Sequence, residues 1–269
     1  MEIKVSTNRE SKIENSKNSK SIIEVIYRIV LLLAILIGWQ LMATKINSSL
    51  LLPMPIDVFK GFISCVTDPE IVKNLLITMQ RVLKGFMYSL AFGLPIGLLM
   101  GFSSVFEKVL SPLIDSVRQV PIMAWVPLTI VWFGIGDGPT IFLIAFAGVF
   151  PIILNSIQGV RSISKDYYNA ARSMGASPLV IFTNVILPAA MPDILTGSRL
   201  AISTGWMSVI WAEFIATSAG LGYSMVQAQT MMKTELLVGL MIFAALIGFM
   251  IDRVLKFINK VLCRWRFAD

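Results

Sequence analysis

The sequence contains no histidine, and it has only two cysteines among 269 residues. Histidine is the commonest metal ligand and the commonest general base of enzymes, so histidine-dependent metal or acid–base chemistry is excluded. Cys65 and Cys263 lie far apart and outside any C-x-x-C spacing, which indicates two incidental thiols. A G-x-x-x-x-G-K-[ST] phosphate loop is also absent. We therefore expect no cofactor and no metal in this chain.

Charge is scarce as well. Charged residues make up 14% of the chain and hydrophobic residues 56%, and the mean hydropathy is +0.77. Ordinary soluble domains contain about 25% charged residues. A soluble protein with an unusually large apolar core would still need a charged surface, and this chain has too few charged residues to form one. The composition predicts an integral membrane protein.

Stretches of about 20 mostly apolar residues, the length that crosses a bilayer as a helix, recur along the chain. They predict an all-α membrane protein with about six transmembrane helices. The expected spans cover residues 22–44, 84–104, 112–133, 139–160, 194–216 and 234–256. The expected organisation is a disordered basic tail (1–21), a first transmembrane helix (22–44), an external loop with an amphipathic helix (45–83), a core transmembrane domain (84–258) that includes a loop over 161–192, and a basic tail (259–269).

The distribution of basic residues predicts the orientation in the membrane. With six spans and both termini inside, fifteen Lys and Arg lie on the cytoplasmic side and four on the outer side, which fits the positive-inside rule. The first apolar run follows a long basic lead without an evident cleavage site, so we expect an uncleaved span. Anionic lipid accounts for the net charge of +7, and the scattered basic residues do not indicate nucleic-acid binding.

The external loop ends in a sequence with helical periodicity. Asp68 and Pro69 have the character of an N-cap and a first helical residue. The residues on the apolar stripe are Ile71, Leu75, Met79, Val82 and Phe86, and the residues expected on the polar side include Asn74 and Arg81. This pattern predicts an amphipathic helix at the outer interface, before the chain turns into the membrane.

The segment "DYYNAARSMGASPLVIFTNVILPAAMP", residues 166–192, is neither apolar enough to span a bilayer nor polar enough to be a linker. Its signals describe two short helices: Gly175 suits a left-handed C-cap, Ser177 and Pro178 start the second helix, and Pro188 and Pro192 stop it. Small and pliable apolar residues surround the turn; they are Ala170, Ala171, Met174 and Ala176. We predict a cytoplasmic helix-turn-helix that inserts into a groove of another protein.

The same segment resembles a known family. It resembles the "EAA" loop of ABC importer permeases, whose pattern is E-A-A-x3-G-x9-I-x-L-P. The positions that correspond to the pattern, with the same spacing, are Asn169, Ala170, Ala171, Gly175, Val185, Leu187 and Pro188. Further stretches are similar to the nitrate, sulfonate and taurine branch of these permeases: "TMQRVLKGF", "PLIDSVRQVPIMAWVPLTIVWFGIGDGP", "FPIILNSIQGVR", "WMSVIWAEFIATSAGLGYSM" and "GFMIDRVLKFINKVLCRW". Asn169 departs from the family's glutamate and removes a charge that could form a salt bridge.

The resemblance implies a type I ABC importer permease bundle in a bacterial cytoplasmic membrane. The implied partners are a second permease copy, two cytoplasmic ABC ATPases that bind ATP and Mg²⁺, an external substrate-binding protein that delivers the solute, and membrane lipid. The residues implied in coupling to the ATPases are Asn169, Ala170, Ala171, Met174, Gly175, Ala176, Leu187 and Pro188. The chain itself is then a transport subunit and not an enzyme.

Polar side chains within the spans are the candidates for the solute pathway, because such groups usually face the protein interior or a water-filled cavity. The candidates are Gln119, Asn155, Gln158, Trp206, Ser208 and Glu213. For Glu213, a role in holding the spans together is the alternative to a role in the pathway. Small residues at four-residue spacing, such as Gly93, Gly97 and Gly101, indicate close helix packing.

Two functions from other classes are the alternatives. A membrane-embedded enzyme would need converging catalytic groups, and the few carboxylates of the spans are scattered. A passive channel would have rings of like residues around a pore but no need of a loop that another protein grips.

The solute is not determined by the sequence: nitrate, sulfonates, taurine, bicarbonate or, in some members of the branch, vitamin precursors are all compatible.

Overall fold

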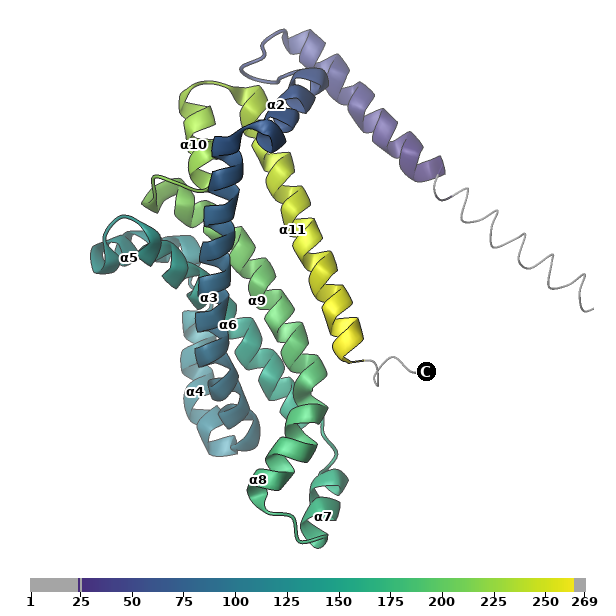
Figure 1. Ribbon diagram of the computed structural model, residues 1–269, viewed down its shortest axis with the longest axis vertical. Helices are drawn as coiled ribbons and strands as arrows, with labels where there is room; N and C mark the ends of the chain where they lie inside the picture. The colour runs from purple at the N-terminus through teal and green to yellow at the C-terminus, as the bar shows by residue number, and fades with distance from the viewer. Residues whose placement is uncertain (1–23, 25, 264–269) are drawn as a thin grey trace, which may run out of the picture.

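The computed structural model describes Glu24 and residues 26–263, and every regular element in this part of the chain is helical (Figure 1). Five of the described helices are long and apolar enough to cross a membrane. A sixth crossing results if the bent pair Ser104–Val117 and Ile122–Phe133 counts as one span. The prediction of an all-α membrane protein with about six spans is confirmed. The predicted tail 1–21 and the last six residues of the tail 259–269 lie outside the described residues.

Three long helices form the centre of the bundle: α3 (Pro69–Phe102), α6 (Asp137–Arg161) and α9 (Leu187–Ala216). Helix α6 packs along α3 on one side and along α9 on the other (Figure 1). Their sequences are apolar with small residues on the contact faces, which lets the helices approach where lipid provides no hydrophobic driving force.

The packing of α3 on α6 leaves no room for a side chain at the glycine ridge. A Cβ added to Gly97 would lie 2.7 Å from the Cβ of Ser156 and 2.8 Å from the carbonyl oxygen of Ile153. Gly93 and Gly101 face α6 in the same way. The ridge predicted from the sequence therefore packs helices together and does not line a cavity at this contact.

A second layer consists of α2 (Pro55–Thr67), α10 (Leu221–Thr230) and α11 (Thr234–Leu262) at one end and side of the centre (Figure 1). Helix α2 crosses α11 so closely that a Cβ on Gly239 would lie 2.7 Å from the backbone nitrogen of Phe62. The largest buried apolar cluster joins this layer to the three central helices. Its members are Cys65, Ile71, Val82, Ile144, Trp206, Val209, Leu221, Met225, Ala228, Leu240, Phe243 and Ala244.

The predicted span over 112–133 is broken in the structure. Helix α4 (Ser104–Val117) ends within the predicted span, and the short η1 (Ile122–Trp125) leads into α5 (Val126–Phe133) at an 86° bend from α4. Pro121 at the break lacks a backbone N–H and disfavours helical geometry in the residue before it, which ends the first helix.

The predicted external loop over 45–83 is mostly helical, and the expectation of a separate amphipathic helix in it is wrong. Asp68 caps α3 as predicted, but the helix then runs unbroken to its end inside the bundle, since no pair of helix-breaking residues interrupts it. Lys73 and Gln80, on the side expected to be polar, are exposed, but Asn74 and Arg81 of that side are buried together with Thr78, each at most 7% exposed. Their partners, described below, are polar groups of distant elements.

At the other end of the molecule lie α7 (Lys165–Ser173) and α8 (Pro178–Ile181), followed by a π-helical segment, 182–186, that continues into α9. The prediction that Pro188 and Pro192 stop this helix is wrong, because both lie within a continuous helical stretch. The wider π-turn makes room for Pro188, since it precedes the proline directly and its closing hydrogen bond spans one residue more than in an α-helix.

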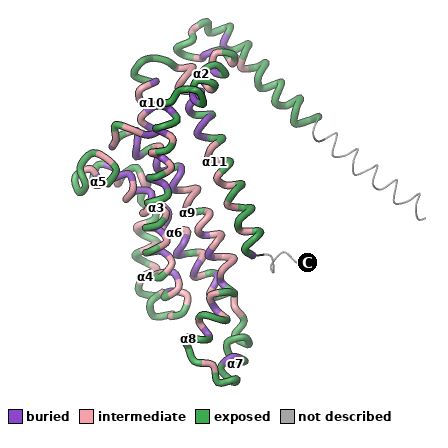
Figure 2. Tube along the Cα trace, in the orientation of Figure 1, coloured by how far each residue is buried: buried purple, intermediate pink, exposed green. Residues whose placement is uncertain are grey.

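The N-terminal helix, Ile26–Ile46, leaves the bundle and is exposed along almost its whole described length (Figure 2). Ala43 is its one buried residue within the described range. The indole Nε1 of Trp39 donates a hydrogen bond of 3.0 Å to the carbonyl of Pro53, which fixes the far end of the helix beside α2.

Candidate functional site

An elbow, residues 164–187, projects beyond the central helices at the end of the molecule opposite α2 and α10 (Figure 1). Ser164 caps α7, and Gly175 adopts the left-handed conformation predicted for it, with φ of +79°. Ser177 caps α8 with Pro178 in its first turn, as predicted. The side chain of Met174 stands at the turn and is 81% exposed. The elbow thus presents an apolar tip to its surroundings.

The base of the elbow is anchored in the bundle. A small buried cluster of Ala171, Ile181 and Ile186 holds the two short helices together. The ring of Phe182 lies 5.5 Å from the ring of Phe102 at the end of α3. Of the residues implied in coupling, Asn169, Ala170, Met174, Gly175 and Pro188 are exposed, Ala176 and Leu187 are half-buried, and Ala171 is buried. A firm base with an exposed tip suits a part that another protein grips.

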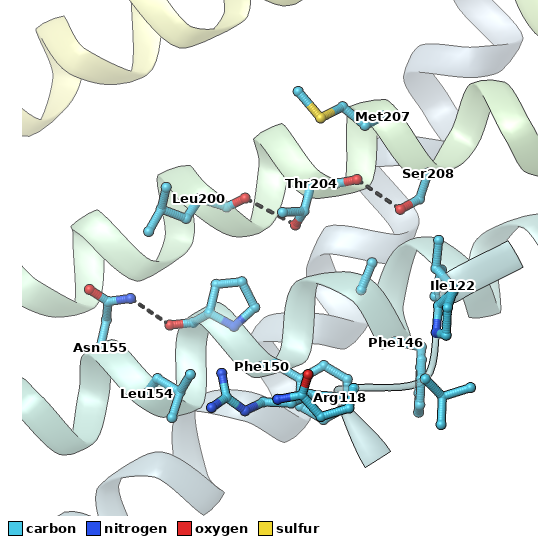
Figure 3. A pocket seen from close by; sticks show the side chains of 15 residues that line it. Arg118, Ile122, Phe146, Phe150, Leu154, Asn155, Leu200, Thr204, Met207 and Ser208 are labelled. Atoms are coloured by element: carbon cyan, nitrogen blue, oxygen red, sulfur yellow. Dashed lines mark hydrogen bonds between the residues drawn. The ribbon is translucent and has the colours of Figure 1, made fainter. Parts of the chain in front are cut away.

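A cavity of about 600 Å³ lies between α6, α9 and the break after α4. Figure 3 shows Arg118 and Phe150 on one wall and Thr204 and Met207 of α9 on the opposite one. The remaining polar lining comes from three residues that the sequence singled out, namely Gln119, Asn155 and Ser208. The rest of the lining is apolar, as in most small-molecule sites.

The structure separates the other pathway candidates from this cavity. Gln158 is exposed elsewhere on α6. Trp206 is 7% exposed, packs in the large apolar cluster and lines a different groove, of about 770 Å³, between α9 and α11. Glu213 is completely buried at the end of α9 near α10. Of the six residues predicted for the pathway, three line the cavity and the other three, Gln158, Trp206 and Glu213, lie elsewhere.

Glu213 is the centre of a buried polar network. Its carboxylate accepts hydrogen bonds from Nη1 of Arg81 at 2.8 Å, from the hydroxyl of Thr78 at 2.9 Å and from the backbone N–H of Gly222 at 3.0 Å. The same guanidinium donates through Nε and Nη2 to Asp137 at 2.8 and 2.6 Å. Three separate parts of the bundle are therefore tied to one arginine of α3: α9, the start of α6 and the start of α10.

The network extends along α3 to the loop before α10. The amide of Asn74 donates to Ser224 at 2.9 Å and accepts from the backbone N–H of Gly220 at 3.0 Å. Gly220 has φ of +111°, and a Cβ there would lie 2.3 Å from the carboxylate of Glu213. A glycine is therefore required both by the backbone conformation and by the space that the carboxylate occupies.

Sequence reasoning missed this network, apart from the alternative in which Glu213 holds the spans together. A signal existed: Asn74, Thr78 and Arg81 recur at helical spacing within one apolar helix, and polar groups at such depth need partners. The partners lie 56 to 150 residues away along the chain, so a single sequence does not reveal them.

Comparison with known proteins gives the family. Residues 93–266 match the family described as "Binding-protein-dependent transport system inner membrane component". A putative ABC transporter permease of Methanocaldococcus jannaschii is 34% identical over 90% of this chain and 93% of its own length. The putative aliphatic sulfonates transport permease protein SsuC of Bacillus subtilis is 33% identical over 88% and 87%. The taurine transport system permease protein TauC of Escherichia coli is 32% identical over 85% of each chain.

Solved structures share the fold. A chain of the MetNI methionine ABC transporter, in inward-facing conformations, superposes with a TM-score of 0.64 at 19% identity, over 71% of this chain and 95% of that chain. A chain of an amino acid ABC transporter gives a TM-score of 0.60 at 20% identity, over 76% and 97%. These likenesses confirm the importer-permease bundle. On the family match and the relatives together, this multi-pass membrane protein belongs to the binding-protein-dependent transport system inner membrane components, as a permease subunit of an ABC importer.

Proposed function

We propose that two copies of this chain form the pathway of an ATP-driven importer. Two cytoplasmic ATPases, which bind ATP and Mg²⁺, grip the elbows, and an external binding protein delivers the solute at the α2–α10 end. The observation that carries this proposal is the elbow itself. Its tip projects beyond the bundle with Met174 81% exposed, while its base is buried. Fully burying a methionine side chain contributes about 1.5–3 kcal/mol, so the tip is a natural anchor for a partner.

The proposed orientation places the elbow in the cytoplasm, with both termini on that side of the cytoplasmic membrane. Arg161, Lys165 and Arg172 lie at or beside the elbow. Basic residues beside a membrane favour the cytoplasmic face, where anionic lipid attracts them. The chain itself has no ATPase role in this proposal, since energy enters through the gripped elbow.

The proposed mechanism is a lever. The elbow continues through the π-helical segment into α9 without a break in the helix. When ATP closes the ATPase pair, the two elbows move with it, and the helices re-pack between an inward-open and an outward-open arrangement. The solute then reaches the pathway from one side at a time.

For the solute we propose a small molecule that carries an anionic group such as a sulfonate or nitrate. The supporting observation is that relatives similar over most of the chain are named for taurine, aliphatic sulfonates and nitrate. A vitamin precursor or related small organic compound is the second candidate within the same family branch.

The test of the coupling proposal is a pair of substitutions at Gly175. Nothing lies within 4 Å of a Cβ added there, so a substitution acts through the backbone conformation alone. Valine at a positive φ costs at least about 1–2 kcal/mol, whereas asparagine tolerates this region. We expect Gly175→Val to reduce co-purification of the ATPase from native membranes roughly 5- to 30-fold, and Gly175→Asn to retain it.

The measurement is purification of the tagged chain in a mild detergent, with mass spectrometry of the bound proteins and ATP-driven uptake in cells. Met174→Asp is a second variant that keeps the turn but places a charge at the tip, and it should also release the ATPase. If Gly175→Val and Met174→Asp both keep the ATPase bound and uptake intact, the elbow is not the coupling device. A passive channel then becomes the better account.

A further inference from the structure

We propose that Arg118, at the break between α4 and η1, selects anionic solutes in the cavity shown in Figure 3. The inference rests on the proposed function for the role of the cavity in transport. The positive charge itself can be tested without that assumption.

Arg118 lies at the end of α4 that is far from the turn joining α3 to α4. Helix α4 begins at Ser104 and runs for 14 residues, about 21 Å, before Arg118 follows it. In the proposed orientation the α3–α4 turn is on the cytoplasmic side, and 21 Å is roughly two thirds of a 30 Å hydrocarbon core. Charged groups at membrane depth face protein or a water-filled cavity and mark solute pathways. Here the break in the span and the cavity coincide, as in binding sites built at discontinuous helices.

The lining of the cavity has a positive balance. Its fifteen residues include Arg118 and no aspartate or glutamate. The hydroxyl groups of Thr204 and Ser208 donate to backbone carbonyls of α9 at 3.0 and 2.8 Å, and the amide of Asn155 donates to the carbonyl of Pro151 at 2.8 Å. These groups are engaged within their own helices. The guanidinium is therefore the cationic donor that the described lining offers to a solute.

The one ion pair of Arg118 leaves most of its hydrogen-bonding capacity for a ligand. Its Nε donates to Asp115 one turn earlier at 2.9 Å, and both side chains are partly exposed, at 39% and 54%. Such exposed pairs hold an arginine only weakly. The two terminal amino groups form the fork that matches two oxygens of a sulfonate, carboxylate or nitrate group. Asp115 thus orients the arginine without neutralising its outer edge.

The alternative is that Arg118 only fixes the geometry of the break through Asp115. The two accounts differ in what each charge does to the cavity. If Arg118 selects by charge, Arg118→Gln makes the cavity less attractive to anions and Asp115→Asn makes it more attractive. If the pair is purely structural, both substitutions disturb the break, and neither shifts the preference between anions and cations.

The experiment measures the charge of the cavity through a cysteine probe. Met207 lines the edge of the cavity and also the groove between α9 and α11, and it is 69% exposed, so Met207→Cys places an accessible thiol at the rim of the cavity. The chain is purified in detergent and treated with two methanethiosulfonates, one carrying an anionic sulfonatoethyl group and one a cationic trimethylammonioethyl group. Peptide mass spectrometry reports the rate at position 207 and leaves the native cysteines in place. The ratio of the anionic to the cationic rate is the readout.

We expect Arg118→Gln to lower this ratio about fivefold at low salt, because a unit charge on the cavity wall changes each rate a few-fold in opposite directions. Arg118→Lys should keep the ratio, and Asp115→Asn should raise it. The matched control is Lys108→Gln on the same helix, which removes an exposed charge outside the cavity and should leave the ratio unchanged. The effect should shrink at 1 M salt, where the Debye length is about 3 Å.

A competition arm identifies the preferred charge of a solute. Methanesulfonate should protect position 207 more than methylammonium, a cation of similar size, and Arg118→Gln should abolish the difference. An unchanged rate ratio in Arg118→Gln, or equal protection by both compounds, would overturn the proposal. In the assembled complex, labelled taurine serves as the uptake probe. If taurine uptake by the unsubstituted complex does not depend on ATP, the proposed function is wrong, while the rate ratio still decides the role of Arg118.

Discussion

The buried arginine of α3 gives the sharpest test of the structure. Arg81 is 5% exposed, and its guanidinium contacts Asp137, Glu213 and the carbonyl of Ala219 at 2.6 to 2.8 Å. The substitution Arg81→Met keeps an unbranched apolar stem and removes every donor. The side chain of Asp137 is 57% exposed and can be solvated after the change, but Glu213 has no exposed surface. The carboxylate of Glu213 would remain with only Thr78 and Gly222 as donors.

The expected cost follows from that loss. Removing one partner of a buried ion pair costs roughly 3–5 kcal/mol, because the other charge stays buried without compensation. For a chain of this size, each kcal/mol lowers the melting temperature by about 2–4 °C, so we expect Arg81→Met to melt about 6–20 °C lower. The assay is thermal unfolding of the purified protein in detergent, followed by intrinsic fluorescence and by the fraction that stays monodisperse on size exclusion.

Two further variants make this prediction specific. Arg81→Met combined with Glu213→Gln should recover part of the loss, since a neutral amide is less costly to bury than an uncompensated carboxylate. Arg118→Met, which breaks a partly exposed pair, should shift the melting temperature by no more than about 4 °C. If Arg81→Met and Arg118→Met behave alike, or if the double variant is no more stable than Arg81→Met, the network does not hold the helices together as argued.

Three other outcomes are expected from the packing and the thiols. Gly97→Val should destabilise by about 1–3 kcal/mol or more through overpacking of α3 on α6, whereas Gly38→Val, with nothing within 4 Å, should melt normally. Ser224→Ala removes the acceptor of the Asn74 amide and should cost roughly 1–3 kcal/mol in the same assay; an unchanged melting curve would mean that water replaces it. Burial raises the pKa of Cys65 to about 11, and the thiolate is the reactive form of the side chain. Maleimide labelling of this thiol in the folded protein should therefore be very slow at pH 7, accelerate as the pH rises toward 11, and be fast after denaturation. Rapid labelling at pH 7 would contradict the burial of Cys65.

The features that the sequence predicted well depend on local signals. The spans follow from hydropathy, and the elbow follows from capping residues and from one glycine, because Gly175 and Ser177 act on their immediate neighbours. The prediction that the prolines end the helix was wrong because another local feature compensates for the proline ring. A π-turn directly before Pro188 absorbs the ring, so the helix continues where a stop was predicted. No propensity rule for single residues contains that compensation.

The features that the sequence did not predict depend on contacts across the bundle. Arg81 and Asn74 were placed on the polar side of the helix because helical periodicity sorts residues by hydrophobicity, and periodicity does not show which polar residues have buried partners on other helices. The cavity was only half predicted for a similar reason. Gln119, Asn155 and Ser208 were candidates by their polarity at membrane depth, whereas Arg118 was not among them, because its spacing of three residues from Asp115 on one helix is typical of a local ion pair. In the structure Arg118 forms that pair and also lines the cavity.

One helix connects the three functional parts of this permease. The helical stretch Pro178–Ala216 has 39 residues, about 58 Å of helix, which is longer than a bilayer core is thick. It starts in the elbow, contributes Thr204 and Ser208 to the cavity, and ends with Glu213 held by α3. In the proposed lever mechanism, a displacement of the elbow is transmitted to the cavity wall through this continuous helix, whose far end is held by the buried ion pair of Glu213 with Arg81. The apolar cluster at the base of the elbow keeps its two short helices together, so in this mechanism the elbow moves as one unit with the near end of α9.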